Sequence, residues 1–251
     1  MHALSAQEIL RIWEIGSGQH PVDRALTILA TAFPELPRES LVALSVGQRD
    51  TYLLDVRKYT FGTRLACFTE CLKCRERLEF ELDVTDIQVE QSEAYPAPPE
   101  VYRAYTSQSE RYELRFRLPT SLDLAAIAVC SDIVAARNLL VQRCLLQVMS
   151  VGVEVDVKAV PEAVIATLAT QMGERDPQAE VQIDLACPAC DYRWPVLFDI
   201  VVFLWKEICV QAKRLLREIH TLAWAYGWRE ADILSLSPAR RQFYLEMVTN
   251  G

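Results

Sequence analysis

Residues 181–200 read VQIDLACPACDYRWPVLFDI, and this stretch contains the pattern that decides the fold. Its first residues alternate between apolar and polar side chains, which predicts a half-buried strand. Cys187 and Cys190 follow as a Cys-x-x-Cys turn, and residues 194–200 are expected to form the return strand. A turn of this kind between two strands is typical of one half of a zinc ribbon.

A second Cys-x-x-Cys turn, Cys71-Leu72-Lys73-Cys74, lies far upstream and precedes an alternating strand at residues 78–84. Two such turns supply the four thiolates of a tetrahedral zinc shell. The 112 residues from 75 to 186 separate the turns, whereas ordinary ribbons have about 15 to 20 residues there. The sequence therefore predicts a zinc ribbon split by a long insertion, with one structural zinc held by Cys71, Cys74, Cys187 and Cys190.

Three alternatives to a zinc site stay open. Zinc knuckles favour glycine directly after the second cysteine, because that residue often needs a positive φ, but these positions hold Arg75 and Asp191. Aspartate tolerates this conformation and arginine does so poorly. The cysteines could therefore be two pairs of buried thiols without metal, or a thiol redox site.

Cys67 adds the third alternative, because Cys67, Cys71 and Cys74 have the C-x3-C-x2-C spacing of an iron–sulfur cluster in radical enzymes. Such enzymes need repeated βα units and a glycine-rich stretch, and the sequence indicates neither. The remaining cysteines lie on apolar faces of expected helices and are predicted to be core residues: Cys130, Cys144 and Cys209.

Both ends of the chain have helical patterns. Start signals for helices occur at Ser5 with Glu8, at Pro21, at Ser45, at Asp199 and at Ser237 with Pro238. The helix that begins at Asp199 has a broad apolar face and is expected to end at Gly227.

The centre has a mixed pattern. It contains a polar, proline-rich stretch at 90–100 that predicts a loop, an alternating strand at 111–118, a long helical region from Thr120 or Ser121 to Met149, a short strand at 151–157 and a helix from Pro161 to Met172. We therefore expect an α+β protein with helical modules at both termini around a β-rich centre. The expected domains are a helical module at 1–62, a β-rich centre with the split zinc ribbon and a helical insertion at 63–198, and a helical module at 199–251.

Composition excludes several classes of protein. Glycine provides only eight of 251 residues, and neither G-x-G-x-x-G nor G-x-x-x-x-G-K-[ST] occurs, so no phosphate-binding loop is expected. The formal net charge is −8, which argues against nucleic acid as a partner. An apolar fraction of 51% and a mean hydropathy of +0.08 predict a chain that buries a large core.

Nothing in the sequence predicts export or a membrane span. Glu8, Arg11 and Glu14 interrupt the first apolar residues, and the most apolar run, 194–205, is shorter than a spanning helix and contains Asp199. We expect a cytoplasmic protein that can be incorporated into an assembled particle. In the cytoplasm thiols stay reduced, which favours metal ligands or buried thiols over disulfides.

The sequence predicts binding rather than catalysis. The only histidines are His2, His20 and His220. No motif in the sequence combines a nucleophile with a base and a group that orients the base. Aromatic residues and arginines, which are enriched in protein interfaces, gather near the C-terminus instead. The predicted partner-binding residues are Trp224, Trp228, Arg229, Arg240, Arg241 and Phe243.

Several helix and loop patterns resemble the T-even phage baseplate hub assembly chaperone family. They include Phe116 to Ser121 with Asp123-Leu124, Leu44-Ser45 to Leu53, Phe198-Asp199-Ile200, Phe203-Leu204-Trp205, Arg214 to His220, Tyr226-Gly227-Trp228 and Leu236-Ser237 with Arg240 to Leu245. The resemblance implies a non-enzymatic role in assembling the baseplate or hub of a contractile, phage-tail-like injection system, with baseplate or hub proteins as partners. The alternatives are a zinc-ribbon adaptor that binds nucleic acid and, less favoured, a thiol redox or iron–sulfur enzyme.

Overall fold

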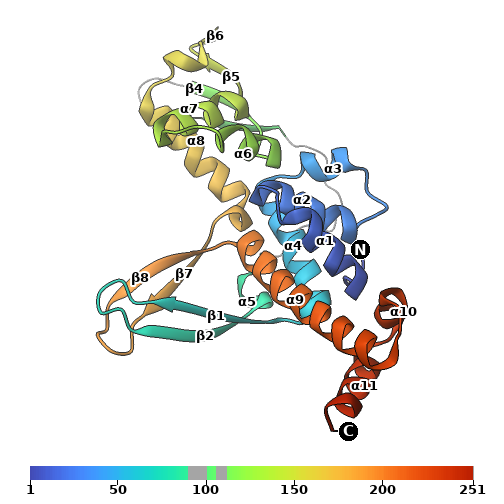
Figure 1. Cartoon of the computed structure of the whole chain (residues 1–251). Coiled ribbons are helices and arrows are strands. Elements are labelled where there is room, and N and C mark those ends of the chain that lie inside the picture. The colour runs from blue at the N-terminus through green and yellow to red at the C-terminus, as the bar shows by residue number, and fades with distance from the viewer. Residues whose placement is uncertain (90–100, 106–111, 251) are drawn as a thin grey trace.

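The computed structural model describes residues 1–89, 101–105 and 112–250. A central body of helices has two β-hairpins on one side, a lobe of sheet and helices at one end and the C-terminal helices at the other (Figure 1). The expected α+β class, with helices at both termini and strands in the centre, is confirmed. The loop predicted at 90–100 lies outside the described residues.

Helices from both ends of the chain build the central body. They are α1 (Ala6–Gly16), α2 (Pro21–Ala32), α3 (Arg38–Ala43), α4 (Val46–Phe61) and the long α9 (Ile200–Tyr226). The predicted capping box at Ser5 and Glu8 is present, and Ser45 caps α4 in the same manner. The short helix α3 was not predicted.

One hydrophobic core joins these helices. Ile12, Leu29 and Leu53 come from the N-terminal part, and Leu204 and Leu215 from α9, and all of them are buried in the same cluster. The helix α9 therefore holds the C-terminal part of the chain against the N-terminal helices. Beyond Gly227, which has a φ of 69°, α10 (Glu230–Ser235) and α11 (Pro238–Asn250) fold back against α9.

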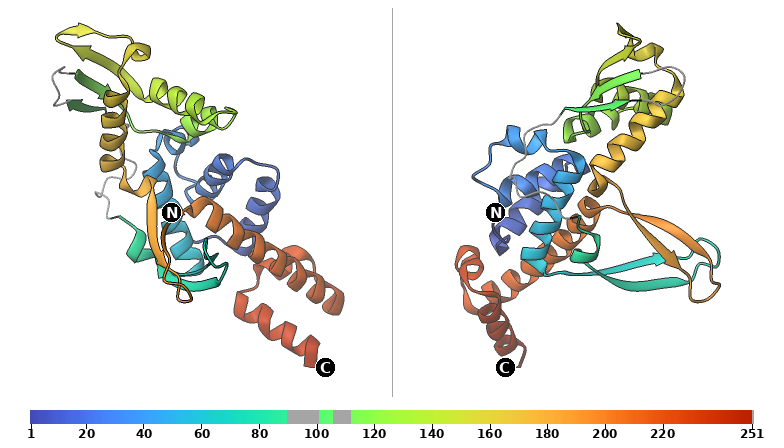
Figure 2. Two further views of the ribbon diagram at one scale, coloured as in Figure 1. Left: turned by 90° about the vertical axis from the view of Figure 1, so that its left-hand side faces the viewer. Right: turned by 180° about the vertical axis from the view of Figure 1, so that it is seen from behind.

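Two antiparallel hairpins project from this body. The first consists of β1 (Arg64–Glu70) and β2 (Arg77–Asp83), followed by the short helix α5 (Val84–Ile87). The second consists of β7 (Val181–Ala186) and β8 (Arg193–Phe198), which leads directly into α9. Seen from behind, the two hairpins leave the body at different points and converge at their tips (Figure 2). Strand β1 was not predicted; β2, β7 and β8 were.

The insertion between the hairpins forms a lobe of its own. A sheet in the order β3-β4-β5-β6 consists of β3 (Tyr102–Tyr105), β4 (Tyr112–Phe116), β5 (Leu145–Ser150) and β6 (Val153–Glu154). The helices are α6 (Ser121–Ile127), α7 (Ile133–Cys144) and α8 (Glu162–Arg175), with 3-10 turns at Val157–Ala159 and Pro177–Ala179. Leu114, Phe116 and Val148 of the sheet pack on Val164 and Leu168 of α8.

The helical region predicted from Thr120 or Ser121 to Met149 is present as two helices, α6 and α7, but its last residues form the strand β5. Asp132 caps a second helix, its carboxylate accepting hydrogen bonds from the N–H groups of Val134 and Ala135, so α6 and α7 are separate. From Leu145 the chain pairs with β4 instead of continuing as a helix. The strand predicted at 151–157 shrinks to Val153–Glu154, because Val151 and Gly152 form the turn of a tight hairpin.

Polar contacts attach the lobe to the body. Ser45 and Thr120 form an isolated antiparallel bridge, and the N–H of Val46 donates to the carbonyl of Pro119 at 2.9 Å. On the other side, the carboxylate of Asp176 accepts hydrogen bonds from Ser45 and Gly47 at the start of α4. Across 1–89, 101–105 and 112–250, no helix has both the length and the apolar character that crossing a membrane requires.

Candidate metal centre

The two Cys-x-x-Cys turns lie at the tips of the two hairpins. Glu70 pairs with Arg77 as the last pair of the β1–β2 ladder, and Ala186 pairs with Arg193 at the corresponding end of β7–β8. Each hairpin thus carries its cysteines just beyond the end of its ladder. The convergence of the tips brings residues separated by more than a hundred positions to one place.

The turns have the same hydrogen-bond pattern. In the first, the N–H of Cys71 donates to the carbonyl of Glu76 at 2.8 Å, and the N–H of Arg75 donates to the carbonyl of Cys71 at 3.0 Å. In the second, Cys187 donates to the carbonyl of Tyr192 at 2.9 Å, and Asp191 donates to the carbonyl of Cys187 at 2.9 Å. The chain therefore builds the same knuckle twice.

The residue after the second cysteine has a positive φ in both knuckles: 64° for Arg75 and 55° for Asp191. These are the positions where zinc knuckles favour glycine. The left-handed conformation costs a residue with a Cβ roughly 1 to 2 kcal/mol. Both turns therefore have the knuckle conformation, although Arg75 and Asp191 favour a positive φ less than glycine does.

The four sulfur atoms form a compact cluster. The Sγ atoms of Cys71 and Cys190 are 3.7 Å apart, those of Cys74 and Cys187 are 3.5 Å apart, and all four lie within 4.8 Å of one another. A tetrahedral site with Zn–S bonds of about 2.3 Å places its sulfurs about 3.8 Å apart. The four cysteines therefore fit a tetrahedral four-thiolate site, the geometry typical of zinc or iron.

Burial differs between the two cysteines of each knuckle. Cys71 and Cys187 are buried, Cys190 is half-buried and Cys74 is exposed. Leu78 and Trp194 pack beside the buried pair as a small separate core, and the ring of Tyr192 stacks on that of Trp194 with centroids 5.7 Å apart. This core is too small to hold the hairpin tips together unaided, so a metal cross-link would add much of their cohesion.

Local hydrogen bonds favour the thiolate at Cys71. Burial acts to raise the pKa of this thiol, but backbone N–H groups of Cys74 and Lys73 outweigh it and lower the pKa to about 6. The N–H of Lys73 lies 3.4 Å from the sulfur. The pKa values of Cys74 and Cys190 are raised instead, so of these three thiols only Cys71 has its thiolate, the form that binds metals, favoured.

The other cysteines lie outside this cluster. Cys67, whose spacing suggested an iron–sulfur site, is on β1 and is not part of the four-cysteine group. Of the three predicted core cysteines, Cys144 is buried, whereas Cys130 and Cys209 are only half-buried. Cys130 lies in the connection between α6 and α7 rather than on a helix.

The six predicted partner-binding residues have different surroundings. Trp224 is 86% exposed, and Phe243, Arg229 and Arg240 are exposed as well. Trp228 is half-buried and stacks on Tyr226, with ring centroids 4.7 Å apart.

Arg241 differs from the other five because it is buried. Its Nε donates to the carboxylate of Glu218 at 3.1 Å, and its Nη1 donates to the carbonyl of Leu236 at 2.6 Å. In the folded chain the charge of Arg241 holds α11 against α9, and its predicted role in partner binding stays a prediction.

Sequence reasoning missed an apolar hollow between the two hairpins and α9, lined in part by Phe68 and Leu197. Phe68 belongs to the outward phase of β1, alternating with the inward Leu65 and Cys67. A large apolar side chain in the polar phase of a half-buried strand was the available signal.

Comparison with known proteins places the chain in a family. A family model described as T4 bacteriophage base plate protein matches residues 23–205, which is well over half of the chain and includes both knuckles. The comparisons with curated proteins and with solved structures gave no significant match. The matched region begins in α2 and ends in α9, so it includes the hairpins and the lobe. The chain belongs to the T4 bacteriophage base plate protein family.

Proposed function

We propose that this protein is a non-enzymatic assembly factor or structural component of the baseplate or hub of a contractile, phage-tail-like injection system, and that it acts by binding other proteins. The observation that carries the proposal is the family match over residues 23–205. A baseplate is built from protein–protein contacts, so baseplate or hub proteins are the expected partners. The protein would be made in the cytoplasm and incorporated into, or released from, the particle there.

A single zinc ion, bound by Cys71, Cys74, Cys187 and Cys190, would be structural in this proposal. All four positions would be filled by protein thiolates, which is the closed coordination of structural zinc sites. The ion would close a loop of more than a hundred residues and so restrict the unfolded chain. The sulfur separations of 3.5 and 3.7 Å support this role.

Part of the predicted C-terminal surface remains a candidate for partner binding. Trp224, Arg229, Arg240 and Phe243 are exposed, Trp224 to 86%, and exposed tryptophan, phenylalanine and arginine are the residue types enriched in protein interfaces. These four residues lie beyond the region matched by the family model.

Co-purification tests the proposal. The tagged full-length chain is co-expressed with each baseplate and hub protein encoded near its gene. We expect one of them to co-elute with the wild-type chain and Trp224→Ser to weaken that complex. Val153→Ser, which also replaces an exposed apolar side chain with serine but lies in the lobe, should leave it intact. A wild-type chain that elutes as a monomer and co-elutes with none of the baseplate or hub proteins would overturn the proposal.

A further inference from the structure

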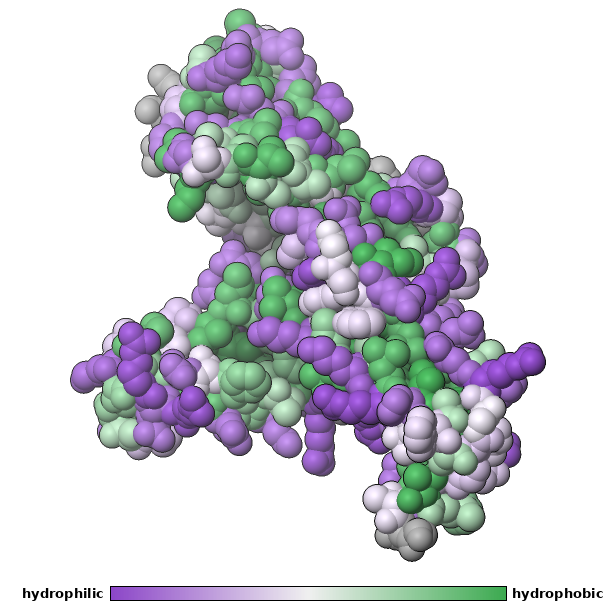
Figure 3. Space-filling view, viewed as in Figure 1, coloured by the Kyte–Doolittle hydropathy of each residue, from purple (hydrophilic) through white to green (hydrophobic). Residues whose placement is uncertain are grey.

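A groove opens between the two hairpins and α9. It has a volume of about 620 Å³. Its walls are residues 66–69 of β1, residues 196–198 of β8, Asp199, Phe80 of β2, Ile183 of β7 and the α9 side chains of Val202, Phe203, Lys206, Glu207, Val210 and Gln211. We call it the apolar groove. Figure 3 shows apolar side chains over the region between the hairpins and the helix. Its size lies within the range of sites that bind ligands or short peptide segments.

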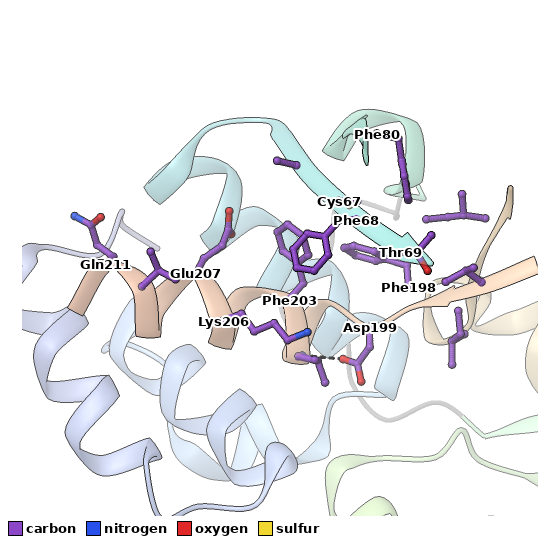
Figure 4. A pocket seen from close by; sticks show the side chains of 16 residues that line it. Cys67, Phe68, Thr69, Phe80, Phe198, Asp199, Phe203, Lys206, Glu207 and Gln211 are labelled. Atoms are coloured by element: carbon purple, nitrogen blue, oxygen red, sulfur yellow. Dashed lines mark hydrogen bonds between the residues drawn. The ribbon is translucent and has the colours of Figure 1, made fainter. Parts of the chain in front are cut away.

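Large apolar side chains in the groove face solvent. Phe68 is 81% exposed and Leu197 is 61% exposed, and Val210 of α9 is exposed as well. The rings of Phe198 and Phe203, 5.6 Å apart, form the floor beside them (Figure 4). Apolar surface gathered in one concavity marks a binding site more strongly than scattered exposed residues do.

The two sides of the groove are strand edges. Four consecutive residues of β1 and the last three of β8 line it, whereas β2 and β7 contribute one side chain each, Phe80 and Ile183, so β1 and β8 are the strands that border the groove. Among the described residues, β1 pairs with β2 alone and β8 with β7 alone. The outer backbone N–H and C=O groups of β1 and β8 therefore have no partner strand. An extended segment that lies along such an edge gains main-chain hydrogen bonds.

Charge indicates which segments would bind. Residues 64–83 and 180–199, which form the two hairpins, contain nine acidic and five basic side chains, a net charge of −4. At the groove itself, Lys206 lies beside Glu207 in the lining. The carboxylate of Glu207 is bound by Arg57, with Nη2 at 2.8 Å, and that of Asp199 caps α9 through the N–H of Val202 at 3.0 Å. The acidic excess therefore lies on the hairpins beyond the groove lining, where it favours basic residues at the ends of a bound segment.

We infer that the apolar groove captures an extended, apolar segment of a partner protein, flanked by lysine or arginine, which adds as a strand to the edge of β1 or β8. The inference rests on the proposed assembly role and names the class of segment that is bound. The segment's alternate side chains would pack against Phe68, Leu197 and Phe203. The metal at the hairpin tips would fix the spacing of the two edges.

A display library of random nonapeptides, selected on the immobilised full-length chain, tests the inference. We expect enriched peptides to have apolar residues at alternate positions and basic residues at the ends. Synthetic copies, measured by fluorescence anisotropy, should bind Phe68→Ser and Leu197→Ser at least tenfold more weakly. Val153→Ser is the matched control, because Val153 is 67% exposed but belongs to the lobe, and it should bind as the wild type does.

Methylation of the peptide backbone distinguishes strand addition from simple apolar contact. N-methylation at every second residue removes the donors of one edge while the side chains stay the same, and we expect one of the two methylation registers to lose at least tenfold in affinity. Equal binding of both registers, acidic flanks in the selected peptides, or equal binding to the groove variants would overturn the inference. Self-association of the wild type that Phe68→Ser abolishes would also overturn it, because a second copy would then occupy the groove.

Co-purification of the groove variants with hub proteins distinguishes a wrong groove inference from a wrong proposed function. If Phe68→Ser and Leu197→Ser still co-purify with a hub protein as the wild type does, the groove inference falls and the assembly role stands. If the wild type itself binds no hub protein, the assembly role falls.

Discussion

The carboxylate of Asp176 accepts a hydrogen bond of 3.0 Å from the hydroxyl of Ser45, across 131 positions of sequence. Its other oxygen accepts the N–H of Gly47 at 3.0 Å. Ser45 is the cap of α4 and Asp176 follows α8, so this one carboxylate joins the lobe to the first turn of a body helix. Asp176 is buried, and its loss would leave the hydroxyl and the amide without this acceptor.

Gly47 makes this contact possible, and its replacement should be costly. A Cβ at position 47 would lie 2.1 Å from Oδ1 of Asp176 and 2.9 Å from the backbone nitrogen of Ala179. We expect Gly47→Ala to lower the free energy of unfolding by about 2 kcal/mol or more. Gly173→Ala in α8 is the control: a Cβ there meets nothing within 4 Å, so helix propensity should stabilise it by about 0.5 to 1 kcal/mol. Urea denaturation measures the free energy of unfolding of both variants. An equal change in this free energy for Gly47→Ala and Gly173→Ala would contradict the close contact at Gly47.

Glycine at position 75 should stabilise the chain. Arg75 has a φ of 64°, a conformation that glycine adopts without cost, so we expect Arg75→Gly to raise the free energy of unfolding by about 1 kcal/mol. Arg77→Gly in β2 should do the opposite, because glycine weakens a strand interior. Chemical denaturation in the presence of metal measures the free energy of unfolding of the Arg75→Gly and Arg77→Gly variants and of the wild type. A destabilised Arg75→Gly protein would mean that the arginine side chain itself contributes more than its backbone conformation costs.

Removing one of the four clustered cysteines should remove the metal. We expect about one zinc per wild-type chain by elemental analysis, and Cys71→Ser to lose most of it and to unfold at a lower temperature. Cys209→Ser, a half-buried cysteine of α9 outside the cluster, should keep its zinc. Wild-type protein purified with iron and visible absorbance, or with no metal at all, would contradict a structural zinc.

Stability should fall as the pH rises from about 4 to about 7, in part because of Asp50. Burial raises the pKa of Asp50 to about 7, although the guanidinium of Arg49, whose Nε lies 2.8 Å from Oδ1, opposes the shift. The unfolded chain releases this proton near pH 4. The folded protein therefore holds a proton that the unfolded chain has lost, and this contribution disappears as the pH passes the folded pKa.

The measurement is the difference in unfolding free energy between pH 5 and pH 8, for the wild type and for Asp50→Asn. The variant cannot titrate at this position, so its loss of stability over the range should be smaller. Equal losses would show that Asp50 is ionised in the folded protein throughout.

Arg240 and Arg241 are neighbours with different expected effects. Arg241 is buried against Glu218, so Arg241→Ala should lower the free energy of unfolding by about 3 kcal/mol. Arg240 is exposed, and Arg240→Ala should change it by less than about 0.5 kcal/mol. Thermal unfolding of the two variants measures this difference in stability. If Arg241→Ala is neutral, the contact between α11 and α9 does not depend on this ion pair.

Local patterns were sufficient to predict the elements with strong signals. The capping box at Ser5 and Glu8, the alternation in β2, β7 and β8 and the long α9 all depend on residues close in sequence. The four clustered cysteines were also predictable, because two Cys-x-x-Cys turns next to strands indicate that they pair. The split of the chain into domains at residues 62 and 198 stays a prediction.

What escaped prediction depends on partners far away in the sequence. Leu145 to Ser150 reads as a continuation of a helix, and only pairing with β4 makes it a strand. Arg241 reads as a surface residue until Glu218, 23 positions away, is placed beside it. The apolar groove exists only because two hairpins from separate parts of the chain converge, and no pattern within either hairpin contains that information.

The placement of one knuckle on each hairpin has a consequence for synthesis on the ribosome. The first hairpin emerges with two thiols, and 112 residues must follow before the second pair begins. At 5 to 20 residues per second, this takes about 6 to 22 s. During that interval the nascent chain carries only half of the four-cysteine cluster, so the timing of delivery of the proposed zinc and the reducing state of the surroundings would become part of how this protein matures.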